Sequence, residues 1–338
     1  MDPHPGPLPA SGERGPSAAI SHMTIAELLQ SSPALITGAA FLLGLVIGSF
    51  LNVVIHRLPI MMDRDWRGQC AELAAENDGH AVQGKIPATA RSQRDAVETP
   101  FNLVVPRSAC PACKAQIRAW QNIPIVSYLL LRGRCAACGA RISLRYPIVE
   151  LLTGVLSAAI VWHFGFAWEA AAALVFTWSL IALSGIDLDH QLLPDSITLP
   201  LLWLGLLLSL GEPSTQGWSI PADPRSSIIG AAAGYLSLWS VFHAFRLFTG
   251  KEGMGYGDFK LFAVFGAWFG WQMLLLIILL AAFTGAVVGI VLIALRRQGR
   301  DIPIPFGPYL AAAGWIALLW GPQIIERYLH LSGLRGGG

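Results

Sequence analysis

The sequence predicts an all-α integral membrane protein that crosses the bilayer about eight times and carries a cytoplasmic four-Cys zinc-binding insert. Hydrophobic residues make up 54% of its 338 residues, while charged residues make up only 13%. A soluble domain carries about a quarter charged residues. The apolar residues also gather in long runs, and all five cysteines lie in the polar stretch between the first two runs, four of them as two close pairs.

Eight runs are nearly free of charge, and each is expected to form a membrane helix. They span residues 35–54, 151–164, 170–186, 197–210, 228–245, 259–271, 273–295 and 308–320. Several approach the ~20 residues that an α-helix needs to cross a ~30 Å hydrocarbon core, and the shorter ones need flanking residues or a thinner bilayer. A large soluble helical core would require polar helix faces, which these runs lack.

The runs divide the chain into five segments. We expect a disordered N-terminal extension at 1–33, a first transmembrane helix at 34–55, a polar insert at 56–147, a membrane domain at 148–323 and a tail at 324–338. Residues 1–22 are rich in Pro, Gly and Ser and have no apolar core, so they do not form a signal peptide. Within the insert, the polar stretch 71–98 is expected to be a flexible loop.

The positive charge is unevenly placed and therefore predicts the topology. Thirteen of the 23 Lys and Arg residues lie between His56 and Pro147, and three more lie at 296–300. The positive-inside rule therefore assigns 56–147, 246–258 and 296–307 to the cytoplasm. An even number of spans then leaves both termini on the opposite side.

The cysteines of the insert form two pairs, Cys110-Pro-Ala-Cys113 and Cys135-Ala-Ala-Cys138, with 21 residues between them. Each pair can turn two thiolates toward one point, which is the spacing of zinc-ribbon and zinc-knuckle sites. Two disulfides are the alternative, but a cytoplasmic location disfavours them. Four thiolates leave no open position for water, so the predicted zinc is structural. Cys70 has no partner in this pattern.

Acidic residues lie at the ends of two predicted membrane helices. Asp187, Asp189 and Asp195 follow one span, and Asp258 lies in Gly253-Met-Gly-Tyr-Gly-Asp at the start of another. Intramembrane acids are functional candidates by default. Two adjacent carboxyls can share one proton, so that one acts as a general base toward water and the other as an acid. A helix cap at Asp258 and a turn at Pro194-Asp195 are the structural alternatives.

Two other classes of function fit part of this pattern. A proton-coupled transporter would use the intramembrane acids as a relay, but the sequence has no paired broken-helix repeats and such a protein has no use for the cysteine insert. A zinc-dependent scaffold without catalysis would leave the acids unexplained.

Seven strings of the sequence together resemble the bacterial type IV prepilin peptidase family, whose members are both leader peptidases and N-methyltransferases. They lie at 48–59, 105–110, 132–135, 143–150, 186–195, 250–260 and 305–308. Among them are Ile186-Asp-Leu-Asp-His-Gln-Leu-Leu-Pro-Asp195 and Gly255-Tyr-Gly-Asp258. The strings run in order through residues 40–325.

The resemblance implies an eight-helix enzyme of the bacterial inner membrane with its active site facing the cytoplasm. Such enzymes cleave the basic leader of type IV prepilins and type II secretion pseudopilins and then methylate the new N-terminal residue with S-adenosylmethionine. The family's paired catalytic aspartates match Asp187 and Asp258, with Gly255, Gly257 and Lys260 in the supporting loop. Its metal ligands match Cys110, Cys113, Cys135 and Cys138, in an insert associated with methyl transfer.

The remaining assignments are less determined. Asp189 and Asp195 are alternatives to Asp187, although Asp195 is expected to cap the next helix. Lys260 either holds an anionic group of a substrate or lipid or extends toward the headgroups. Beyond the substrates, membrane lipids are expected partners and nucleic acid is not, and a homo-oligomer is compatible with the sequence.

The methyl-transfer site is the least determined feature, because the chain has no Gly-rich fingerprint of a Rossmann-type methyltransferase. Gly133 and Glu150 are candidates because they lie in the family-like strings near the insert, as do Asn52 and Arg57. The structural alternative for Glu150 is an ion pair with Arg145 or Arg141.

Overall fold

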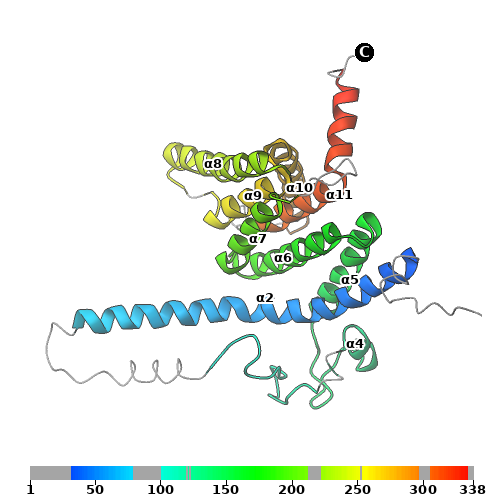
Figure 1. The fold of residues 1–338 in the computed structure, drawn as a ribbon. Coiled ribbons are helices and arrows are strands. Elements are labelled where there is room, and N and C mark those ends of the chain that lie inside the picture. Colours follow the sequence, from blue (N-terminus) through cyan, green and yellow to red (C-terminus); the bar gives the residue numbers. More distant parts are fainter. Residues whose placement is uncertain are drawn as a thin grey trace, which may run out of the picture.

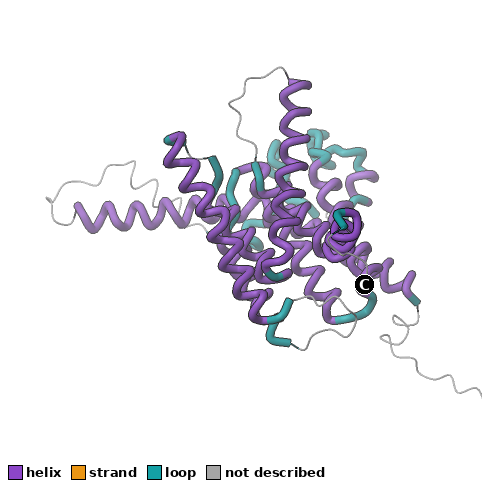
Figure 2. Tube along the Cα trace, turned by 90° about the horizontal axis from the view of Figure 1, so that it is seen from above, coloured by secondary structure: helices purple, strands orange, loops and turns teal. Residues whose placement is uncertain are grey.

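The computed structural model describes residues 32–78, 100–118, 121, 123–211, 222–251, 253–296 and 305–333. Almost all of the expected N-terminal extension and most of the expected loop at 71–98 lie outside these residues. In the described parts the chain is helical, with no strand and only two isolated β-bridges (Figure 2). The helices are α2 (Pro33–Asp78), α4 (Val126–Leu130), α5 (Arg145–Phe164), α6 (Trp168–His190), α7 (Asp195–Leu208), α8 (Pro224–Thr249), α9 (Tyr256–Phe269), the 3-10 turn η2 (Trp271–Met273), α10 (Leu274–Arg296) and α11 (Gly307–Leu331).

Each of the eight apolar runs forms a helix, which confirms the all-α membrane fold. Among the described helices, α2, α5, α6, α8 and α10 are long and apolar enough to cross a membrane. The helices α7 and α9 have 14 residues each, which corresponds to about 21 Å and is shorter than a typical hydrocarbon core. The count of eight complete spans therefore remains a prediction.

The expected segment boundaries differ from the helix boundaries at three places. The first helix does not end at residue 55, because α2 continues without a break to Asp78 through Pro59. It therefore includes the first residues of the stretch expected to be a loop. The boundaries expected at 147 and at 323 fall inside α5 and α11. A helix leaving a bilayer has no reason to stop at the membrane surface unless Gly, Pro or a cap ends it.

The long helix α2 packs against α5 and α6, and the other membrane helices lie beyond α6 (Figure 1). The loops of the insert and α4 lie on the other side of α2 in that view. Among these other membrane helices, α9 is central, because it contacts α7, α8, α10 and α11. All of its residues from 261 to 269 are buried. It is therefore the core helix of the membrane domain, although it is one of the shortest.

Two features hold α9 in this position. The indole of Trp268 is fully buried, packs 4.7 Å from the ring centroid of Phe176 in α6, and donates a 2.9 Å hydrogen bond to the carbonyl of Leu201 in α7. On its other face, α9 approaches α8 so closely that a Cβ placed on Gly266 would lie 2.0 Å from the carbonyl oxygen of Gly230. Small residues at both positions are what permit this backbone contact.

We predict that Gly266→Val separates α8 from α9 and lowers the melting temperature of the detergent-solubilised protein. Overpacking a well-packed core costs roughly 1–3 kcal/mol, and here the obstructing group is backbone, which cannot rotate away. Gly38→Val in α2 is the matched control, since no atom lies within 4 Å of a Cβ built there. Equal melting temperatures for both variants would contradict the packing described.

Candidate functional site

Asp187 and Asp258 lie at the same end of the helix bundle, Asp187 in the last turn of α6 and Asp258 in the first turn of α9. Both are buried, with 5% and 7% of their surface exposed. They are close enough for their charges to repel one another. Membrane helices bury an acid at high cost, so two neighbouring buried acids indicate a functional pair.

The first turn of α11 supplies a partner for Asp187. The backbone N–H of Gly307 donates a 2.9 Å hydrogen bond to Asp187 Oδ2. A Cβ at position 307 would lie 2.6 Å from that same oxygen, so only glycine lets the helix come this near. The free N–H groups of a helix start carry partial positive charge, and they stabilise a carboxylate placed against them.

Leu193 is packed between the start of α9, which carries Asp258, and the start of α11, which binds Asp187. It belongs to the short connection from α6 to α7 and is buried. A Cβ on Gly257, the residue before Asp258, would lie 2.7 Å from Leu193 Cβ. A Cβ on Gly307 would lie 3.3 Å from Leu193 Cδ2. Gly257 therefore lies against Leu193, and Gly255 lies beside Asp258 at the start of α9; the supporting role of both glycines stays a prediction.

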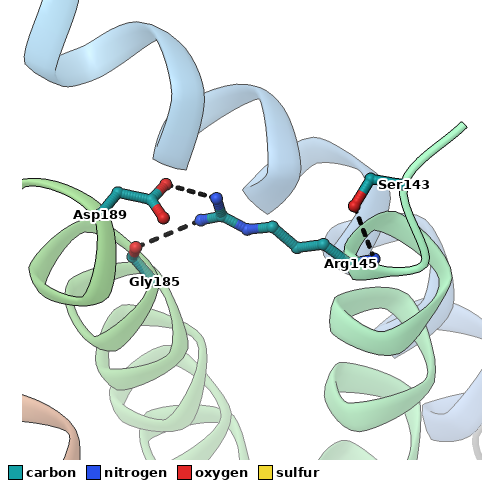
Figure 3. A network of polar contacts seen from close by, with 4 residues as sticks. All are labelled: Ser143, Arg145, Gly185 and Asp189. Atoms are coloured by element: carbon teal, nitrogen blue, oxygen red, sulfur yellow. Dashed lines mark hydrogen bonds and ion pairs between the residues drawn. The ribbon is translucent and has the colours of Figure 1, made fainter. Parts of the chain in front are cut away.

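Asp189 is turned away from the pair and contacts a different helix. Arg145, the first residue of α5, forms an ion pair with Asp189 and also donates a 3.2 Å hydrogen bond to the carbonyl of Gly185 (Figure 3). The Arg145 N–H itself is bonded to Ser143 Oγ at 3.2 Å. Of the first two acids in this string, Asp187 is therefore the buried one and Asp189 serves an interhelical contact.

Asp195 and Lys260 contact each other. Lys260 Nζ lies 2.7 Å from both carboxylate oxygens of Asp195. The expectation that Asp195 caps α7 is wrong, because its carboxylate makes this ion pair and Pro194 is at the N-cap position without a side-chain cap bond. Lys260 joins α9 to the start of α7, an arrangement that the sequence did not reveal.

The four expected metal ligands converge in the insert. The Sγ atoms of Cys110, Cys113, Cys135 and Cys138 all lie within 4.8 Å of one another, and those of Cys110 and Cys138 are 3.9 Å apart. Tetrahedral zinc with 2.3 Å bonds to sulfur requires about 3.8 Å between sulfurs. Backbone N–H groups of Cys113 and Ala112 lower the pKa of the Cys110 thiol to about 6, which favours the thiolate that binds metal.

The two cysteine turns are copies of one another. Lys114 N and Gly139 N each donate a 2.9 Å hydrogen bond to the carbonyl of the first cysteine of their pair, and Lys114 and Gly139 share a positive φ. Each turn also has one isolated antiparallel bridge, Ala109 with Gln116 and Arg134 with Arg141. Every element of the second turn follows its counterpart by 25 residues. The repeat is not evident in the sequence, because only the cysteines and a few small residues recur.

The insert is fixed to α2 by a buried arginine. Arg57 donates hydrogen bonds to the carbonyls of Asn102 (2.9 Å) and Pro106 (2.6 Å), and its guanidinium lies 5.7 Å from the ring centroid of Phe101. Asn52 donates to the carbonyl of Tyr146 at 3.1 Å. Both residues, considered as methyl-transfer candidates, therefore hold the insert and the start of α5 against α2.

Glu150 and Gly133 both contact the short helix α4. Glu150 is buried and accepts a 2.8 Å hydrogen bond from the N–H of Ile125, the residue before α4. The ion pair with Arg145 considered for it is not formed, since Arg145 binds Asp189. Gly133 has a φ of 66°, and a Cβ there would lie 2.7 Å from the Tyr128 hydroxyl.

An open hollow of about 520 Å³ lies at this place. Its lining consists of Tyr128, Arg132, Gly133, Arg134, Arg141, Ile142, Ser143 and Leu144. Three of these side chains are guanidinium groups, so the hollow suits a ligand that carries an anionic group.

Comparison with known proteins decides the family. Residues 174–290 match the model described as type IV leader peptidase family, and residues 42–164 match that of the bacterial peptidase A24 N-terminal domain. The chain belongs to the type IV leader peptidase family. The family suggested by the sequence motifs is thereby confirmed. No solved structure matches the chain.

Three relatives illustrate the likeness, and each is named prepilin leader peptidase/N-methyltransferase. The protein of Stutzerimonas stutzeri is 53% identical over 312 residues, covering 92% of this chain and all of the relative. That of Pseudomonas aeruginosa is 50% identical and covers 93% of this chain and all of the relative. That of Aeromonas hydrophila is 52% identical and covers 90% and 97%, respectively.

We predict that purified protein contains about one zinc per chain, because four converging thiolates at tetrahedral spacing form a closed site. Replacing Cys110 and Cys135 with Ser removes one ligand from each turn and is expected to abolish metal binding. Elemental analysis of the two proteins checks this. Cys70→Ser is the matched control, since Cys70 is exposed and lies outside the cluster; metal-free wild-type protein with four titratable insert thiols would contradict the prediction.

Proposed function

We propose that this chain cleaves the leader peptide of type IV prepilins and type II secretion pseudopilins and then methylates the new N-terminal residue. Membership of the family and the names of relatives that match nearly the whole chain support both activities. The observation that carries the cleavage reaction is the pair of buried acids, Asp187 and Asp258, at one end of a helical membrane domain.

The environments of the two acids suggest their roles. Asp187 accepts the N–H of Gly307 at the start of α11, which stabilises negative charge, so we assign it as the general base. Asp258 starts as the protonated acid. Asp187 takes a proton from water, the water oxygen bonds to the scissile carbonyl carbon, and Asp258 gives its proton to the carbonyl oxygen. The tetrahedral intermediate then collapses: one of its hydroxyl groups returns a proton to Asp258 as the carbonyl re-forms, the C–N bond breaks, and the leaving amine takes the proton held by Asp187.

The fold suits a substrate that is itself embedded in the membrane. A prepilin has a basic leader followed by an apolar helix, so we expect the leader to lie among the cytoplasmic headgroups of the inner membrane and the apolar helix to lie in the bilayer. The scissile bond is then placed at the interface, where the positive-inside rule puts Asp187 and Asp258. The stretch 253–257 carries three glycines next to Asp258 and lets an extended peptide approach closely.

For methyl transfer we propose that S-adenosylmethionine binds in the hollow beside Gly133. Its volume lies within the 300–1,000 Å³ of small-molecule sites, and Arg132, Arg134 and Arg141 provide donors for the carboxylate of that cofactor. The cofactor supplies an electrophilic methyl group for the free amine. A structural zinc held by the four cysteines shapes the turns on which Arg134 and Arg141 lie.

Cleavage tests the acid pair. Asp187→Asn and Asp258→Asn are each expected to slow leader removal by a factor of at least about 10³, because each variant lacks one of the two groups that transfer protons. Asp189→Asn leaves both reacting acids in place and keeps an oxygen that accepts from Arg145, so it is expected to cleave within about tenfold of the wild-type rate. The measurement is the cleavage rate of a purified prepilin in proteoliposomes. A wild-type rate in either of the first two variants would overturn the assignment.

A separate experiment tests the methyl-transfer site. Gly133→Val directs a side chain at the Tyr128 hydroxyl and narrows the hollow. We expect this variant to cleave prepilin normally but to methylate it at least about tenfold more slowly. The mass of the mature N-terminal peptide reports methylation and cleavage together. Gly139→Val also has a positive φ but meets no atom within 4 Å, so it controls for backbone strain; equal methylation by both variants would refute the location.

A further inference from the structure

We propose that the connection between α6 and α7, residues 191–194, is a positioning device that fixes the separation of the two catalytic acids. Its ends are held by two ion pairs, Arg145–Asp189 and Lys260–Asp195. Its buried residue Leu193 packs between Gly257, which precedes Asp258, and Gly307, whose N–H binds Asp187. The inference rests on the proposed roles of Asp187 and Asp258. Neither the four ion-paired residues nor Leu193 provides a reacting group.

The first ion pair holds the end of α6. Arg145 binds both the Asp189 carboxylate and the Gly185 carbonyl, which lie on either side of Asp187 in the sequence (Figure 3). The same turn is pressed against α2, because a Cβ on Gly185 would lie 2.5 Å from Ile55 Cδ1. The turn of helix that carries Asp187 is therefore held by both α5 and α2.

The second ion pair makes the corresponding contact for Asp258. Lys260 is two residues after Asp258, just as Asp189 is two residues after Asp187, and it points away from the pair to Asp195. Asp195 is the first residue of α7 and directly follows the connection. The connection 191–194 is therefore held at both ends: Asp189 before it binds Arg145 of α5, and Asp195 after it binds Lys260 of α9.

Leu193 lies in the connection between the two ion pairs. A Cβ on Gly257 would lie 2.7 Å from Leu193 Cβ, and a Cβ on Gly307 would lie 3.3 Å from Leu193 Cδ2, so both glycines lie against this side chain. Gly257 adjoins Asp258, and Gly307 binds Asp187. A shift of the Leu193 side chain therefore changes the position of one acid relative to the other.

The two ion pairs are expected to affect the reaction rate more than the stability of the fold. The side chains of both pairs are partly exposed, 40% and 34% for Arg145 and Asp189, and 31% and 52% for Lys260 and Asp195. Partly exposed ion pairs contribute little to stability. By contrast, a misplacement of about 1 Å at a catalytic group lowers the rate by as much as about 10²-fold. Breaking such a pair is thus expected to change kcat far more than it changes the melting temperature.

The test is a double-mutant cycle on Lys260 and Asp195 in the full-length protein, reconstituted in proteoliposomes with purified prepilin. Lys260→Gln and Asp195→Asn are each expected to lower kcat about tenfold, with KM changed less than about threefold. The double variant is expected to be no slower than either single variant, because both remove the same contact. The exchanged pair, Lys260→Asp with Asp195→Lys, restores the contact and should return kcat to within about threefold of wild type.

A matched control lies in α2. Arg67 and Asp63 form an ion pair of 2.9 Å whose side chains are 74% and 55% exposed, four residues apart on one helix and outside the acid cluster. Arg67→Gln and Asp63→Asn should leave kcat unchanged. A comparable loss in these variants would show that the effect of the Lys260 pair is not one of position, and would overturn the proposal.

Leu193 provides an independent measurement. Leu193→Ala empties the space between Gly257 and Gly307 and is expected to lower kcat about tenfold at unchanged KM, while Leu193→Met, which keeps the volume, restores most of the rate. Leu202→Ala, a partly buried residue of the same core in α7, controls for the general loss of packing.

The outcomes distinguish this inference from the proposed function. If Asp187→Asn and Asp258→Asn also cleave at the wild-type rate, the proposed catalytic pair is wrong. If those two variants are inactive but Lys260→Gln and Asp195→Asn act additively, or raise KM instead of lowering kcat, only the positioning device is refuted. An effect on KM from Lys260→Gln alone would identify Lys260 as a contact for an anionic group of the substrate.

Discussion

The enclosure of α9 is the constraint on which the rest of the membrane domain depends. Helices α7, α8, α10 and α11 all contact it, and it is buried along its whole second half. Such enclosure requires backbone contact with α8 at Gly230 and Gly266 and a buried indole bonded to α7. Asp258, in the first turn of this enclosed helix, is buried as well, with 7% of its surface exposed.

This arrangement buries two carboxyl groups, which is energetically unfavourable, and few hydrogen bonds or charges compensate for it. Asp187 has a single backbone donor, at the start of α11, and no basic side chain is paired with either acid among the described residues. The nearby cations Arg145 and Lys260 are instead paired with Asp189 and Asp195. A cation beside the pair would hold both acids ionised and remove the proton that one of them must donate. Pairing these cations elsewhere keeps the two acids chemically different.

Much of this was predictable from local patterns, and the rest was not for identifiable reasons. The runs of apolar residues, the cysteine spacing and the acids at helix ends are local signals, so the helices, the converging thiols and the burial of Asp187 and Asp258 follow from them. Leu193 and Gly307 lie in the family-like strings 186–195 and 305–308, but their residue types carry no chemical signal, because a leucine in a turn and a glycine at the start of a helix are ordinary. Their importance depends on contacts between residues 120 apart in sequence. The partner of Lys260 was missed for the same reason, since Asp195 looked like a cap for its own helix.

The placement of the insert relative to the acids agrees with the chemical order of the two proposed reactions. Methylation requires a free amine, which exists only after the peptide bond is cut. Ser143 and Leu144 line the hollow proposed for the methyl donor, and the next residue, Arg145, binds the helix end that carries Asp187. The first turn of α5 thus adjoins both sites, while Asn52 and Arg57 fix it and the insert to α2. A pilin held by its apolar helix in the bilayer therefore needs to move its new N-terminus only past this turn, without leaving the membrane, to pass from one site to the other.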